Sequence, residues 1–164
     1  MRTLLILRHA KTQPDAPRGD RARELIERGH RDAARIGAFI RDSLARPDLI
    51  VTSDATRARQ TADIVATTIG LDDALEIEPR IYDADVSTLI AVVRGLPDSA
   101  ARVIIVGHNP GFELLTDALS SSGSGSIHLP TSGLAIVEFD TERWSNVAER
   151  SGQRRAVVTP KSLA

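Results

Sequence analysis

The sequence predicts an α/β fold with a largely parallel sheet, because short buried strands alternate with amphipathic helices along the chain. Continuous apolar runs at residues 3–7 and 102–106 are typical of strands that are buried on both faces. Between them, residues 25–44 carry apolar side chains at steps of three and four, which is the helical period. The composition agrees with a globular protein, since 41% of the residues are hydrophobic and 26% are charged.

Each element is placed by its pattern and its flanking residues. In chain order we expect strands at residues 3–7, 49–52, 75–78, 102–106, 133–139 and 155–159, and helices at about 20–45, 53–69, 86–94 and 110–119. Pro47 ends the first helix. Ser53 or Asp54 is expected to cap the second helix, which Gly70 ends, and Pro110 suits the first turn of the fourth. The last strand is expected at a sheet edge.

Length and charge limit the classes of function. The 164 residues fit one domain, 1–164, with a mobile Ser/Gly-rich loop at Ser120–Ser126. The absence of cysteine excludes disulfides, thiolate nucleophiles and cysteine-based zinc sites. A formal net charge of −1 gives no drive toward nucleic acid or membrane, and the first apolar run is too short for a signal peptide or a membrane span. We therefore expect a cytoplasmic protein.

Polar residues follow three of the predicted strands. Arg8 and His9 close the first strand, Arg57 lies one turn after the second, and His108 with Asn109 closes the fourth. Because the ligand crevice of an open parallel sheet lies outside the carboxyl ends of its strands, we expect these side chains to meet at one edge. Their convergence predicts a functional site.

The arginines favour an anion over a metal at this site. Zinc needs three or four ligands, and Arg8 and Arg57 would repel a divalent cation. Arginine forks match phosphate oxygens, and the helix start after Pro110 adds backbone N–H groups. We expect bound phosphate and no metal or other cofactor. Arg59 lies about 200° from Arg57 on the helix and is expected on the surface, as are His30 and His128.

Three sequence blocks resemble signatures of the histidine phosphatase superfamily, the phosphoglycerate mutase-like group. Leu7-Arg8-His9-Ala10 resembles its RHG signature, with Ala10 in place of glycine, and SDATRARQT at 53–61 resembles its S-x-x-x-R-A-x-Q-T block. VGHNPG at 106–111 resembles the GHNPG form of the SixA branch of phosphohistidine phosphatases, which Tyr82 and residues 129–133 also fit. The blocks follow the order of the family along nearly the whole chain.

The resemblance implies a phosphoglycerate mutase-like three-layer sandwich, with helices on both faces of a mostly parallel central sheet. It also implies a metal-independent phosphatase in which His9 is the nucleophile and becomes a phosphohistidine that water hydrolyses. Arg8, Arg57 and His108 would surround the phosphoryl group and, with Asn109, bind the substrate. Neighbouring cations should keep His9 neutral, and bound phosphate should keep His108 charged.

Two departures from the family pattern bear on structure and substrate. Residues 23–26 read RELI where relatives have R-P-L-T, so the first helix is expected to start early, capped by Asp20. Asn109 stands where the acid phosphatase branch has an aspartate proton donor, and Asp83 and Asp85 are the nearest candidate replacements. A missing general acid favours the readily broken P–N bond of protein phosphohistidine in a signalling protein.

Other interpretations stay open at this stage. The substrate class could be a small phosphomonoester, or the protein could be a non-catalytic module that binds phosphorylated partners. Lys11, Arg18 and Arg21 follow the nucleophile block and could grip a partner protein or merely solvate the connection. No partner protein, oligomeric state or further substrate detail follows from these residues.

Overall fold

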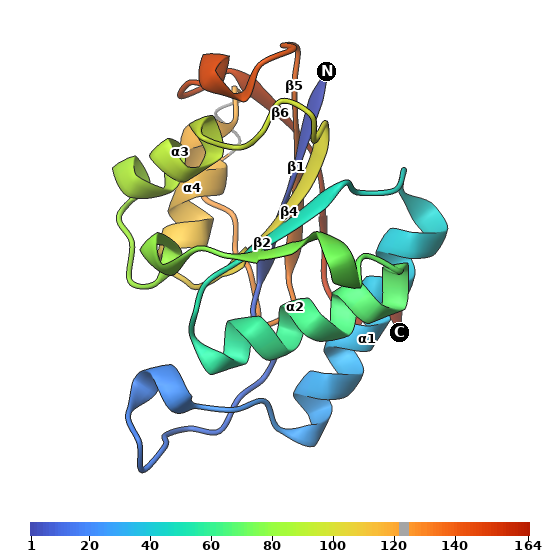
Figure 1. Ribbon diagram of the computed structural model, residues 1–164, viewed down its shortest axis with the longest axis vertical. Helices are drawn as coiled ribbons and strands as arrows, with labels where there is room; N and C mark the ends of the chain where they lie inside the picture. The colour runs from blue at the N-terminus through green and yellow to red at the C-terminus, as the bar shows by residue number, and fades with distance from the viewer. Residues whose placement is uncertain (122–124) are drawn as a thin grey trace.

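Over residues 1–121 and 125–164, which the computed structural model describes, six strands form one sheet in the order β3-β2-β4-β1-β5-β6 (Figure 1). The strands are β1 (Arg2–Arg8), β2 (Leu49–Thr52), β3 (Leu75–Ile77), β4 (Arg102–Gly107), β5 (Leu134–Phe139) and β6 (Gly152–Val158). The first four are paired in parallel, and β5 is antiparallel to both β1 and β6. The sheet is therefore mostly parallel, as the sequence predicts.

Helices cover both faces of this sheet, which confirms the three-layer sandwich (Figure 1). The four are α1 (Glu27–Ser43), α2 (Thr56–Ile69), α3 (Val86–Arg94) and α4 (Gly111–Leu119). Side chains of α1 and α2 pack against one face, and those of α3 and α4 pack against the other. None of the helices in the described part of the chain is long and apolar enough to cross a membrane.

Strand β1 explains the continuous apolar run near the start of the chain. Leu4 and Ile6 belong to the core under α3 and α4, whereas Leu5 and Leu7 belong to the core under α1 and α2. Successive side chains of a strand point to opposite faces, so a strand covered on both sides needs apolar residues at every position. Burial on both faces fixes where β1 ends, and hence where the next residue lies.

The connection from β1 to α1 differs from the prediction. Helix α1 begins at Glu27 with Ile26 as its N-cap, and Asp20 instead begins a short 3-10 helix, η1 (Asp20–Ala22). The prediction that Asp20 caps α1 is therefore wrong. The chain before Glu27 is held extended by backbone pairing, because Ile26 N–H donates to the carbonyl of Lys11 at 3.0 Å.

Two other helix starts and one strand also differ from the predicted ones. Helix α2 has Ala55 as its N-cap, so neither Ser53 nor Asp54 caps it. Gly70 ends the helix as predicted and adopts the left-handed conformation, with φ 76°. Pro110 is the N-cap of α4 and follows a cis peptide bond. Strand β6 lies at the predicted edge but begins three residues early.

The predicted Ser/Gly-rich loop at Ser120–Ser126 lies partly outside the described residues, which omit 122–124. The described residues on its two sides are held by hydrogen bonds that their backbone N–H groups donate. Ser121 N–H donates to the carbonyl of Gly152 at 2.7 Å. Ile127 N–H donates to the carboxylate of Asp117 at 3.2 Å. These two bonds attach the described flanks of the loop to β6 and α4.

Candidate functional site

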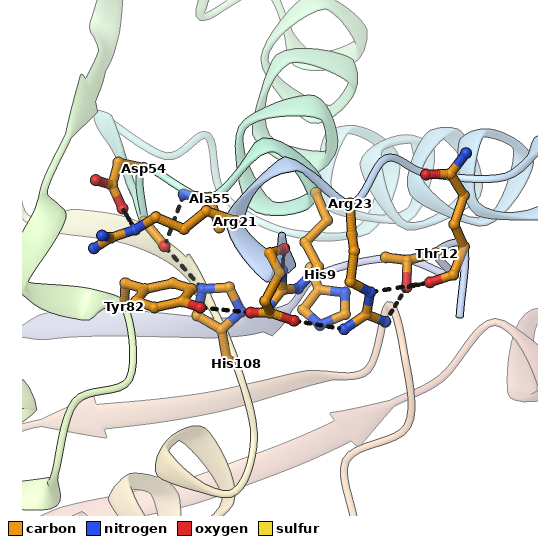
Figure 2. A network of polar contacts seen from close by, with 12 residues as sticks. His9, Thr12, Arg21, Arg23, Asp54, Ala55, Tyr82 and His108 are labelled. Atoms are coloured by element: carbon orange, nitrogen blue, oxygen red, sulfur yellow. Dashed lines mark hydrogen bonds and ion pairs between the residues drawn. The ribbon is translucent and has the colours of Figure 1, made fainter. Parts of the chain in front are cut away.

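The strand register brings the predicted site residues together at the carboxyl end of the sheet. Arg8 pairs with Gly107 at the ends of β1 and β4, so His9 and His108 follow on neighbouring strands. Their ring centroids are 5.4 Å apart. Figure 2 shows the two imidazoles lying between Tyr82 on one side and Arg23 on the other. The sequence prediction that these histidines meet at one edge is confirmed by this geometry.

His9 is 6% exposed and held in one orientation. Its Nδ1 lies 2.8 Å from the carbonyl oxygen of Ala10. A carbonyl oxygen only accepts hydrogen bonds, so Nδ1 carries the proton and Nε2 keeps a free lone pair. Burial lowers the pKa of His9 to about 3, with smaller contributions from His108, Arg57 and Arg8. The predicted neutral state is thus favoured, but burial and not neighbouring cations is its main cause.

His108 is held by a residue of the neighbouring strand end. Its Nε2 lies 2.8 Å from Ser53 Oγ, and Ser53 Oγ also accepts the backbone N–H of Ala55 at 3.2 Å. In a neutral His108 this contact allows either tautomer, because the hydroxyl of Ser53 can donate to Nε2 or accept from it. In a protonated His108 both ring nitrogens carry a hydrogen, and Nδ1 is then an N–H donor. Burial, followed by the charge of Arg57, lowers the pKa of His108 to about 4. In the protein without phosphate this ring is neutral, so the predicted imidazolium requires a bound anion.

Three nitrogen atoms of the site residues are buried without a hydrogen-bond partner in the described part of the protein. They are Nε of Arg8, Nε of Arg57 and Nδ1 of His108. A buried N–H group that finds no acceptor costs about 1–3 kcal/mol. An oxyanion supplies several acceptor oxygens at once, so these groups fit a phosphoryl group better than a metal ion.

Asp20 is the site residue that sequence reasoning missed. Its carboxylate accepts hydrogen bonds from Arg57 and Arg23, both at 3.0 Å, and from the hydroxyl of Tyr82 at 2.5 Å. Its backbone carbonyl also accepts from Arg57 at 2.7 Å. These bonds, that of Tyr82 first, hold the pKa of the Asp20 carboxyl well below its usual range. Only the three-residue spacing to Arg23 could have pointed to Asp20, since its other partners are far away in sequence.

Asn109 and Arg8 both bind the backbone of Leu129 beside the site. The amide of Asn109 donates to the carbonyl of Leu129 at 2.8 Å, and Arg8 donates to the same oxygen at 3.1 Å. The backbone N–H of Leu129 donates to Glu113 at 2.7 Å. One N–H of the Asn109 amide is thus bound within the protein, and its buried Oδ1 has no partner in the described residues.

The two candidate general acids lie in different surroundings. Asp85 caps α3, because its carboxylate accepts from the backbone N–H of Thr88 at 2.9 Å and from Ser87 at 3.0 Å. Those bonds lower the pKa of Asp85, so it does not suit the role of a proton donor. Asp83 is exposed, has a φ of 51° and lines a small recess beside His108 and Asn109.

The remaining predicted residues lie around the rim or on the surface. Arg59, His30 and His128 are exposed as predicted, and Lys11 and Arg18 are exposed too. Arg21 does more than contact solvent: its guanidinium lies 4.1 Å from the ring centre of Tyr82 and 3.5 Å from the carboxylate of Asp54 (Figure 2). Residues 1–121 and 125–164 contain no group of three or more histidine or carboxylate side chains that could hold a metal ion.

Sequence comparisons match the chain to a protein family and to several relatives. A family model described as the histidine phosphatase superfamily (branch 1) matches residues 4–90. An uncharacterized protein of Mycobacterium leprae is 30% identical over 168 aligned positions, covering 94% of this chain and 100% of its own. An uncharacterized protein of Mycobacterium tuberculosis is 34% identical over 149 positions, covering 86% of this chain and 91% of its own.

Solved structures share the fold over nearly the whole chain. A protein from Nakamurella multipartitia assigned as the phosphohistidine phosphatase SixA has a TM-score of 0.85 and 26% identity, covering 97% of this chain and 96% of that one. Another from Agrobacterium tumefaciens, assigned likewise, has a TM-score of 0.77 and 29% identity, covering 97% and 98%. The protein histidine phosphatase SixA complexed with tungstate has the same fold, with a TM-score of 0.86 at 22% identity and 99% of both chains covered.

Proposed function

The chain belongs to the histidine phosphatase superfamily and is a phosphatase, and we propose that it hydrolyses protein phosphohistidine through a covalent intermediate on His9. The observation that carries this proposal is the state of His9. Its Nδ1 proton is donated to the carbonyl of Ala10, so Nε2 has a free lone pair, and the ring lies 5.4 Å from that of His108. Arg57 and Arg8 are near enough to lower the pKa of His9. A neutral imidazole among phosphate-binding donors is arranged as a nucleophile.

The first step transfers the phosphoryl group to the protein. Nε2 of His9 attacks phosphorus while the bond to the leaving group breaks, and the electron pair of that bond departs with the leaving group. Charge in the loose transition state is spread over three oxygens, which Arg8, Arg57 and His108 would stabilise by donating hydrogen bonds. Water then attacks the phosphohistidine, which releases inorganic phosphate and regenerates neutral His9.

The favoured substrate class follows from the proton donors. The amide of Asn109 donates to Leu129 and Asp85 caps a helix, so neither is arranged to protonate an alcohol leaving group. Asp83, which lines the recess beside His108, is the remaining candidate. A phosphoramidate bond breaks with less assistance than an alkyl phosphate. Two solved structures with 26% and 29% identity are assigned as phosphohistidine phosphatases, which supports the same class here.

A rapid-quench experiment tests the intermediate. Mixed with radiolabelled phosphoramidate, the wild-type protein should form a phosphoenzyme that is labile in acid and stable in alkali. His9→Ala should form none while keeping its circular dichroism spectrum. Phosphate binding without covalent labelling would instead support a binding module.

Rates on different substrates test the substrate class. A phosphohistidine-bearing protein should be hydrolysed with a higher kcat/KM than glucose 6-phosphate. The reverse order would identify the protein as a phosphatase of small phosphomonoesters. Both substrates are measured on the same preparation, with His9→Ala as the background control.

A further inference from the structure

The Asp20 carboxylate stands at the rim of the site with capacity to accept another hydrogen bond. Its side chain is 48% exposed, whereas that of its partner Arg57 is 7% exposed. Arg57, Arg23 and Tyr82 occupy three of the roughly four lone-pair positions of a carboxylate. One position is left, on the oxygen that contacts Arg23. Asp20 can therefore receive a hydrogen bond from outside the protein.

Asp20 is also close to the reacting groups. Arg57, which binds both its carboxylate and its backbone carbonyl, is one of the three predicted phosphoryl ligands. Tyr82, which donates to the same carboxylate, places its ring 5.5 Å from that of His108. Asp20 thus lies beside residues that surround the phosphoryl position, and its charge acts on His108, so a group attached to the phosphoryl can meet it at the rim.

The leaving group of phosphohistidine needs one proton in a particular place. If the distal nitrogen of the phosphorylated ring carries a proton, the ring departs as neutral imidazole when the P–N bond breaks. Without that proton it would depart as an anion, which is a far poorer leaving group. A nearby negative charge favours the protonated, cationic ring, since opposite charges close together stabilise the charged form.

We propose that the Asp20 carboxylate accepts a hydrogen bond from the distal ring N–H of the substrate phosphohistidine and so selects this substrate class. The inference rests on the proposed function of the site. In the step, the bond from His9 Nε2 to phosphorus forms and the P–N bond to the substrate breaks. The electron pair of the P–N bond goes to the substrate ring nitrogen, and the proton stays on the distal nitrogen facing Asp20.

This role explains how the site cleaves a P–N bond without proton delivery by Asp83. The proton is already on the leaving group, and Asp20 keeps it there, so no protein side chain has to deliver one. A phosphomonoester has no such N–H to offer, and its dianion gains nothing from a carboxylate at the rim. Asp20 thereby separates N-phosphoimidazole substrates from alkyl phosphates.

The test compares two substrates on one variant. N-phosphoimidazole has the distal nitrogen, whereas 4-nitrophenyl phosphate has a leaving group that needs no proton. In Asp20→Asn, the ratio of kcat/KM for N-phosphoimidazole to that for 4-nitrophenyl phosphate should fall about 10- to 100-fold, the usual range for a hydrogen bond to a charged group. The substitution can also displace Arg57 or unfold part of the protein. Either effect would lower kcat/KM for both substrates by the same factor, so the ratio would not change.

Asp15→Asn is the matched control, because it removes the same charge from the same connection at an exposed position. Its ratio should equal that of the wild type. An unchanged or increased ratio in Asp20→Asn would overturn the inference while leaving the proposed function intact. If wild-type protein itself hydrolyses N-phosphoimidazole no better than glucose 6-phosphate, the phosphohistidine assignment fails, and the inference fails with it.

Discussion

Ser53 Oγ, at the end of β2, lies 2.8 Å from Nε2 of His108, at the end of the neighbouring strand β4. Ser53 is fully buried, and the same oxygen accepts the backbone N–H of Ala55. The ring of His108 is thereby held by a residue of the adjacent strand. A serine that begins the S-x-x-x-R-A-x-Q-T block thus supports a histidine 55 residues later.

Ser53→Ala should lower kcat/KM for 4-nitrophenyl phosphate about 3- to 10-fold, the effect of losing one neutral hydrogen bond that orients a donor. The change leaves His108 present but removes the side chain that holds its Nε2. Steady-state kinetics measure the effect, with Ser87→Ala on the exposed start of α3 as the control. Equal rates for Ser53→Ala and wild type would show that this serine does not orient the ring.

His108→Ala should lower kcat for 4-nitrophenyl phosphate by about 10²- to 10³-fold, as expected for one donor to a developing oxyanion. Its Nδ1 is one of the three buried nitrogen atoms without a partner in the described residues. The protonated ring would donate from this atom, so the loss should appear mainly in the transition state. The control is His30→Ala, which replaces an exposed histidine of α1. A similar decline in both variants would argue against a role for His108 in the reaction.

Stability should fall on acidification because both site histidines are buried in their neutral form. Each has a folded-state pKa, about 3 for His9 and about 4 for His108, below the ordinary value of 6.5. The unfolded chain therefore binds more protons, so stability is fully present above pH 6.5 and is lost as the pH falls toward the folded-state values. Each histidine should account for about 2 kcal/mol of the loss between pH 7 and pH 5.

Urea unfolding at the two pH values, followed by the fluorescence of the single tryptophan, Trp144, measures this loss. His9→Gln should lose about 2 kcal/mol less than the wild type between pH 7 and pH 5. His30→Gln, at an exposed position, should lose as much as the wild type. An equal loss of unfolding free energy in all three proteins would mean that the buried histidines do not cause the loss of stability in acid.

Gly107→Ala should destabilise the protein by about 1–3 kcal/mol through overpacking. A Cβ atom at Gly107 would lie 2.5 Å from the ring of Phe112 and 2.7 Å from Ile81. Gly95→Ala is the matched control, because its nearest neighbour would be 3.4 Å away. Urea unfolding compares the two, and equal free energies of unfolding would contradict the packing argument.

The sequence predicted the sheet and its site best where the pattern is local. The apolar runs of β1 and β4 identify buried strands, and the residues that follow each run identify the edge where His9 and His108 meet. Helix α3 begins and ends at the predicted residues, Val86 and Arg94, because its aspartate cap and apolar period are adjacent in the chain. Such signals need no knowledge of partners elsewhere.

The connection between β1 and α1 could not be predicted in the same way. Aspartate is a residue type that often caps helices. The side chain of Asp20 instead binds Arg57 and Tyr82, which are 37 and 62 residues away. Three donors on one carboxylate outweigh a single cap bond of about 1 kcal/mol. Likewise, burial decides the pKa of His9, and burial depends on how the finished chain packs.

Strand β1 both contributes to the hydrophobic core and positions His9 beside the end of β4. Because neighbouring positions of β1 face opposite layers, deleting one residue from this strand would exchange its two apolar surfaces. The same deletion would draw His9 back by one step, away from its place beside the end of β4. An insertion or deletion within β1 should therefore abolish both folding and activity, whereas the surface connections of the protein can vary in length.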